Sequence, residues 1–120
     1  MEDWANGLDE MAITITDENG NYIDMNNCSK IVNLKDVNKT VVGRNIDSCH
    51  NAKSMEIIKR MMTEGVKNIY TITKNGREKL IYQSPWFKQD GSFGGLVEVT
   101  MFIPKQMPHY DRDAEKKAKQ

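Results

Sequence analysis

The side chains with the most reactive chemistry are two cysteines, Cys28 and Cys49, and two histidines, His50 and His109. The cysteines form no CxxC pair and are too few for a disulfide framework, which favours free thiols in a reducing compartment. Three acidic residues follow His109 in a polar stretch, but nothing in the pattern fixes their spacing. We therefore expect a solvated tail there, and no metal site.

Acidic pairs are the next candidates for acid and base chemistry. Asp9 with Glu10, and Asp17 with Glu18, are adjacent in the sequence, so the side chains of each pair point apart in a helix or a strand. The sequence contains no Ser-His-Asp pattern, HExxH, P-loop or dinucleotide fingerprint. The sequence therefore predicts that the protein is not an enzyme.

The composition limits the class of protein. A length of 120 residues suits one domain, and 17 basic residues balance 17 acidic ones, so we expect no nucleic-acid partner. No apolar run approaches the roughly 20 residues that span a bilayer, and the first residues are acidic where a signal peptide would be basic. We expect no membrane association and a cytoplasmic protein.

The first half of the chain predicts small elements. Residues 1–10 read as an amphipathic N-terminal helix with Trp4 and Leu8 at helical spacing. Alternation predicts a strand over residues 11–16 and a second over 21–25, joined by a turn that ends at Gly20. Between residues 26 and 43, isolated apolar residues among polar ones predict irregular connectors and short helical turns.

The second half predicts one longer helix and three strands. Asn51 can cap a helix that ends at Gly65, and strand-like runs follow over residues 68–73, 78–87 and 96–103. The fold class is therefore α+β, with a five-stranded antiparallel sheet, short helices and one longer helix packed on one face. Residues 11–104 form the predicted domain, and residues 105–120 a polar C-terminal tail.

This order of elements resembles the PAS fold over residues 11–103. An Asp-x-x-Gly turn carries the likeness with Asp17 and Gly20, followed by the helix-capping Asn26. Residues 42–45 (Val-Gly-Arg-Asn) and residues 94–100 are similar to further parts of that family. The Cys49-His50 pair resembles the start of the main helix in PAS domains found beside hemerythrin-like domains, although two prolines usually follow it there.

The resemblance implies a ligand cavity between the longer helix and the sheet. The candidate pocket residues are Cys49, His50, Met55, Ile58, Met62, Ile72, Tyr82, Val97, Val99 and Met101. We expect no cofactor. Flavin is not expected, because Ile46 stands where the light-oxygen-voltage subset has its reactive cysteine. Haem is the alternative, with His50 as axial ligand and Cys49 as a second donor.

Strand alternation also assigns residues to the two faces of the sheet. We place Val97, Val99 and Met101 in the core, which leaves Leu96, Phe102 and Trp86 on the outer face. That apolar patch, together with Trp4 and Leu8, predicts a homodimer interface.

The resemblance implies a signal-transduction module that senses a small molecule and passes its state on through dimerisation or a separate output protein. One alternative is an interaction module that dimerises or docks on a partner without a ligand. Another alternative is a haem-based redox or gas sensor that uses His50.

Overall fold

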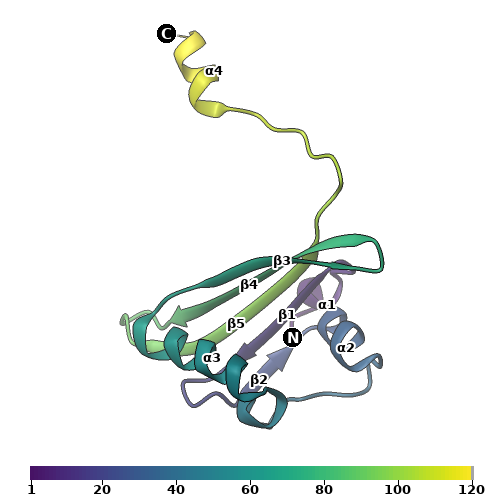
Figure 1. Cartoon of the computed structure of the whole chain (residues 1–120), viewed down its shortest axis with the longest axis vertical. Helices are drawn as coiled ribbons and strands as arrows, with labels where there is room; N and C mark the ends of the chain where they lie inside the picture. Colours follow the sequence, from purple (N-terminus) through teal and green to yellow (C-terminus); the bar gives the residue numbers. More distant parts are fainter. Residues whose placement is uncertain (120) are drawn as a thin grey trace.

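The computed structural model describes residues 1–119 and contains one five-stranded antiparallel sheet with the strand order β2-β1-β5-β4-β3. Helices α2 and α3 lie on the same side of this sheet (Figure 1). The predicted α+β class and the sheet are confirmed. The strands are β1 (Met11–Thr16), β2 (Tyr22–Met25), β3 (Asn68–Lys74), β4 (Arg77–Phe87) and β5 (Phe93–Phe102). The helices are α1 (Asp3–Asn6), α2 (Asn27–Leu34), the 3-10 helix η1 (Ile46–Cys49), α3 (Ala52–Glu64) and α4 (Arg112–Lys119).

The N-terminal helix is shorter than predicted. It ends at Gly7, and it buries Ala5 while Trp4 remains 69% exposed. The Asn26 side chain bonds to the Ala5 carbonyl, which fixes α1 beside the start of α2. Helix α2 itself is two turns long, where the sequence predicted only short helical turns.

The first hairpin is built around the carboxylate of Asp17. Its Oδ1 atom accepts hydrogen bonds from the backbone N–H groups of Asn19 and Asn21, each at 2.9 Å. The bond from the Asn21 backbone is the main reason that the pKa of Asp17 is lowered from its usual value. Gly20 completes the turn at φ +80°, a conformation that glycine adopts without strain. The predicted Asp-x-x-Gly turn is confirmed.

Asn26 joins three elements from a fully buried position. Its Oδ1 accepts from the backbone N–H groups of Ser29 and Ile13, so it caps α2 and also binds β1. Its Nδ2 donates to the carbonyl oxygens of Ala5 and Met11. The cap was predicted from the sequence, but the bonds to α1 and β1 were not.

Helix α3 follows its predicted limits. Asn51 caps it by accepting from the Ser54 backbone N–H, and Gly65 ends it in the left-handed conformation. Ile58 and Met61 are buried, and they pack with Ile46 and Leu96 in the main apolar cluster. The core of the domain therefore lies between α3, η1 and β5.

Leu96 in this cluster shows that the sequence-based assignment of the sheet faces was wrong. Helices α2 and α3 cover one face of the sheet, here called the inner face. This face carries Leu96 and, by strand alternation, every second residue of β5 after it, up to Phe102. Val97, Val99 and Met101 instead alternate onto the opposite, outer face, although Val97 also borders the cavity described below. Alternation shows which residues share a face, but it does not show which face is buried. Both faces of β5 carry apolar residues, so the more apolar face was wrongly predicted to be the buried one.

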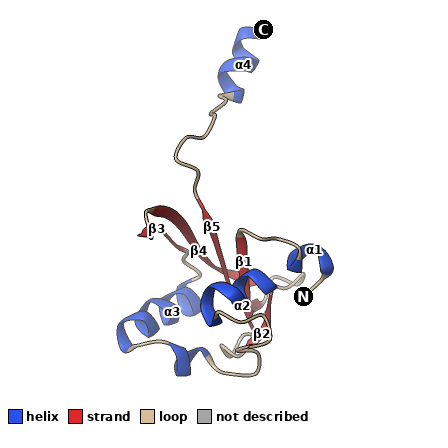
Figure 2. Cartoon of the chain, turned by 90° about the vertical axis from the view of Figure 1, so that its right-hand side faces the viewer, coloured by secondary structure: helices blue, strands red, loops and turns tan. Residues whose placement is uncertain are grey.

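The C-terminal segment leaves the sheet at the end of β5 and carries α4 away from the rest of the domain (Figures 1 and 2). The described side chains of α4 are mostly exposed, as expected for a charged helix without an apolar stripe. Within residues 1–119, no helix has the length and hydropathy needed to cross a bilayer.

Candidate functional site

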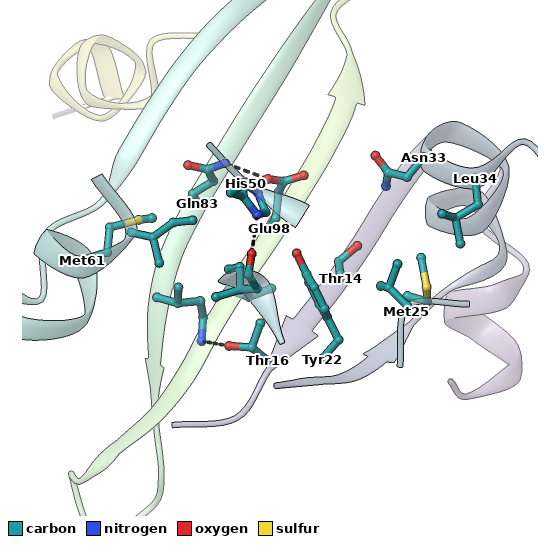
Figure 3. A pocket seen from close by; sticks show the side chains of 15 residues that line it. Thr14, Thr16, Tyr22, Met25, Asn33, Leu34, His50, Met61, Gln83 and Glu98 are labelled. Atoms are coloured by element: carbon teal, nitrogen blue, oxygen red, sulfur yellow. Dashed lines mark hydrogen bonds between the residues drawn. The ribbon is translucent and has the colours of Figure 1, made fainter. Parts of the chain in front are cut away.

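A cavity of about 290 Å³ lies between the inner face of the sheet and the helices (Figure 3). Strands β1, β2, β4 and β5 form one wall, α2 and α3 form the other, and residues of the segment that includes η1 close one side. The lining residues are Thr14, Thr16, Tyr22, Met25, Asn33, Leu34, Val41, Ile46, His50, Ile58, Met61, Gln83, Leu96, Val97 and Glu98.

A row of polar side chains crosses the sheet wall of the cavity. Gln83, Glu98 and Thr14 are paired directly across β4, β5 and β1, so their side chains form one row. Gln83 Nε2 donates to Glu98 Oε2 at 2.7 Å, and Gln83 Oε1 accepts from Asn68 Nδ2 at 2.9 Å. The row therefore extends onto β3, since Asn68 is the register partner of Gln83.

Helix α2 continues this polar row. The hydroxyl groups of Thr14 and Ser29 are 2.5 Å apart, and Asn33 Nδ2 donates to Ser29 Oγ at 3.1 Å. Asn33 itself lines the cavity. A ligand would therefore meet amide, hydroxyl and carboxylate groups along the sheet and at the near end of α2.

The helix wall of the cavity is mainly apolar. Ile58 and Met61 come from α3 and Leu34 from the end of α2, and Met25 of β2 lies beside Leu34 (Figure 3). Met25 and Met61 are almost fully buried, and thioether side chains adapt to irregular shapes. An amphipathic molecule would match the difference between the two walls.

His50 closes one side of the cavity. Its Nδ1 donates to the Ile46 carbonyl oxygen at 2.9 Å, so in the neutral ring Nε2 is the acceptor. Backbone bonds hold the preceding segment against the first hairpin: Tyr22 N–H donates to the Arg44 carbonyl, and Ile46 N–H donates to that of Gly20. The Val-Gly-Arg-Asn motif therefore positions one wall of the cavity.

The structure brings together only part of the predicted pocket. His50, Ile58 and Val97 line the cavity, and Met55 and Met62 pack beside the apolar cluster. Four other pocket candidates do not line the cavity: Ile72 is exposed on β3, while Tyr82, Val99 and Met101 lie on the outer face. The side chain of Cys49 lies outside the described part of the structure.

Two residues assigned to the dimer face lie elsewhere. Leu96 is buried beside α3, and Phe102 is register-paired with Lys79 and has the Arg77 guanidinium 3.6 Å from its ring centroid. Trp86 is half-buried, and its indole N–H donates to the Thr16 carbonyl at 3.1 Å.

The polar row was missed because each of its members stands alone within an apolar strand. Gln83 follows Tyr82, and Glu98 lies between two valines, so each looks like a solvent-facing residue of a half-buried strand. The available signal was that Thr14, Gln83 and Glu98 occupy mid-strand positions, where antiparallel pairing can bring them into register.

The other potentially reactive side chains do not contribute to the candidate site. Cys28 is a buried free thiol whose Sγ bonds to the Asp9 carbonyl, and burial raises its pKa, which disfavours the reactive thiolate. Among the described side chains, no three His, Cys, Asp or Glu residues gather where they could hold a metal ion.

Comparison with known proteins finds similarity in structure but not in sequence. No family model and no curated protein sequence matches the chain. A C-terminal domain from Streptococcus mutans superposes with a TM-score of 0.67 at 20% identity, covering 83% of this chain and 80% of that one. The PAS domain of the histidine kinase ThkA gives a TM-score of 0.61 at 16% identity, covering 77% of this chain and 98% of that domain.

A third similar structure comes from a receptor. The Aer2 receptor from Vibrio cholerae, described as a dual PAS-heme oxygen sensor, gives a TM-score of 0.55 at 15% identity, covering 78% of this chain and 95% of that one. At these identities the likeness concerns the fold. Together with the strand order, the Asp17 turn and the Asn26 cap, it shows that this chain has the PAS fold.

Proposed function

We propose that the protein is a sensory module that binds a small amphipathic molecule in the cavity between α3 and the inner face of the sheet. The observation that carries this proposal is the cavity itself, with a row of polar side chains on its sheet wall and apolar side chains from α3 opposite. Its volume lies at the lower end of the range for small-molecule sites. The similar PAS domains of ThkA and Aer2 belong to a histidine kinase and to an oxygen-sensing receptor, which supports a role in signalling.

Haem does not fit this cavity. His50 could offer Nε2 to an iron atom, but a volume of about 290 Å³ is too small to enclose a macrocycle between the helices and the sheet. We therefore propose a ligand-binding function that involves no haem.

Filling the cavity should abolish binding. The probe is phenethyl alcohol, an apolar ring with one hydroxyl group, titrated by calorimetry. Replacement of Ile58 by Trp projects an indole into the cavity, so the affinity should fall at least about tenfold, equivalent to about 1.4 kcal/mol. Ile57→Trp is the matched control, because Ile57 is exposed on the same helix, and it should bind as the unaltered protein does.

Two results would contradict the proposal. The first is an unaltered protein that shows no saturable binding of phenethyl alcohol or of an amine or a carboxylate of the same shape. The second is equal binding by correctly folded Ile58→Trp protein. Circular dichroism and the unfolding midpoint confirm folding, since overpacking costs about 1–3 kcal/mol.

The apolar outer face of the sheet supports a second function, self-association. Ile13, Val99 and Tyr82 are register partners at its centre, and Leu80 pairs with Met101 beside them. The ammonium group of Lys67 lies 5.8 Å from the centroid of the Tyr82 ring. Helices α2 and α3 cover only the inner face. We propose that a second copy of the chain covers the outer face, because such a surface is self-complementary and a formally neutral chain does not repel its copy.

A charge at the centre of the outer face should dissociate the dimer. Sedimentation at micromolar concentration should give a dimer mass for the unaltered protein and a monomer mass for Val99→Glu, because the carboxylate would be desolvated at the interface. Val42→Glu adds the same charge to an exposed residue before η1 and should remain dimeric. A monomeric unaltered protein would refute self-association through this face.

A further inference from the structure

The carboxylate of Glu98 has no cationic partner among the described residues. The residues that line the cavity include neither lysine nor arginine, and the ion pairs of the described residues all lie elsewhere. Its protein hydrogen bond comes from the neutral amide of Gln83, to Oε2. Among the described residues, Oε1 has no hydrogen-bond partner.

The hydrogen bonds of Gln83 hold the Glu98 carboxylate in place and leave its Oε1 atom able to accept a hydrogen bond from a ligand. The Gln83 carbonyl is occupied by Asn68, so the amide presents its N–H group to Glu98 and cannot turn without losing two bonds. The negative charge also acts beyond the cavity: burial, and then the charge of Glu98, raise the pKa of Tyr70. A half-buried carboxylate of this kind is stabilised most by a charge-assisted hydrogen bond.

The remaining walls limit the shape of the ligand. Thr14 is the register partner of Glu98, and its hydroxyl adds a polar contact beside the carboxylate. Across the cavity, Ile58, Met61 and Leu34 present apolar surface, and the volume of about 290 Å³ restricts the apolar part to a short chain or a single ring.

We propose that the cavity selects a small amphipathic cation, with a protonated amine bound to Glu98 and a short apolar group against α3. This inference rests on the proposed ligand-binding function and names the class of ligand. The ammonium group donates to Oε1, and the Gln83 amide continues to donate to Oε2. A carboxylate ligand would meet Glu98 as a like charge and would bind most weakly.

Three ligands of one shape test the proposal: phenethylamine, phenethyl alcohol and phenylacetate. Calorimetric titrations are run at about pH 8, where the aliphatic amine is protonated and an unperturbed imidazole is neutral. The amine should bind at least about tenfold more tightly than the alcohol, and the acid most weakly.

Two variants test whether Glu98 causes the preference for the amine. In Glu98→Gln protein, the amine and the alcohol should bind within about threefold of each other. Glu56→Gln removes the same charge from an exposed residue of α3 and should keep the preference for the amine. If Glu98→Gln protein does not fold, the order of the three ligands on the unaltered protein still decides the question.

The outcomes separate the two proposals. If the alcohol or the acid binds as tightly as the amine, the cation inference is overturned and the ligand-binding function stands. If the preference for the amine survives in folded Glu98→Gln protein, the role given to Glu98 is wrong. If none of the three ligands binds saturably, the proposed function fails as well.

Discussion

Replacement of Asn26 by Ala should destabilise the domain by about 3 kcal/mol or more, which is a large part of the 5–15 kcal/mol typical of a domain. The substitution removes the cap of α2, worth about 1 kcal/mol. It also leaves the Ile13 N–H group and the carbonyls of Ala5 and Met11 without their side-chain partner in a buried place. Urea unfolding at equilibrium measures the loss.

Asn51→Ala is the matched control for this substitution. Asn51 has the same residue type and the same capping role at α3, but its side chain is exposed, and among the described residues its hydrogen bond is to the Ser54 backbone N–H. The expected loss is about 1 kcal/mol. Asn26→Asp keeps the two accepted bonds and replaces the donor group, so it should lie between the two alanine variants. Equal losses for Asn26→Ala and Asn51→Ala would show that Asn26 acts only as a cap.

The second large effect is expected at Gly95, where β5 passes close to the end of β1. Its φ of +149° is a conformation that other residues rarely adopt, and a Cβ atom there would overlap the carbonyl oxygen of Thr16. That oxygen is held in place by the Trp86 indole, so neither strand can move without losing bonds. Gly95→Ala should therefore cost about 3 kcal/mol or more, measured by urea unfolding.

Gly91→Ala provides the comparison. Gly91 also has a positive φ, +87°, but nothing lies within 4 Å of the position of its Cβ. Only backbone strain remains, so the expected loss is about 1 kcal/mol. If Gly95→Ala were no more damaging than Gly91→Ala, the close approach of Gly95 to Thr16 would be refuted.

Local signals predicted the fold because each depends on a few neighbouring residues. Asp17 and Gly20 define their turn through bonds within five residues, and Asn51 and Gly65 mark the ends of α3. Strand alternation likewise predicted the members of the sheet. Helix α1 was overestimated, because Gly7 ends it before the predicted apolar stripe is complete.

The site was predicted less well, because it depends on long-range pairing. Gln83 and Glu98 are 15 residues apart, and their contact follows from the register of β4 and β5. The inner face could not be identified from apolarity, because the strand face that lines the cavity carries the polar residues Thr14, Gln83 and Glu98. Leu96 and Val99 therefore exchanged faces between the prediction and the structure. In a domain with a binding cavity, the polar face of a strand can be the internal one.

The central claim is that the inner face, and not the outer one, receives the ligand. Titration of isotope-labelled protein with phenethyl alcohol, followed by two-dimensional NMR, tests it residue by residue. We predict saturable shifts at Thr14, Leu34 and Glu98, which line the cavity, and little change at Ile13 and Val99. Shifts confined to Ile13 and Val99, or no saturable shifts at all, would contradict the account.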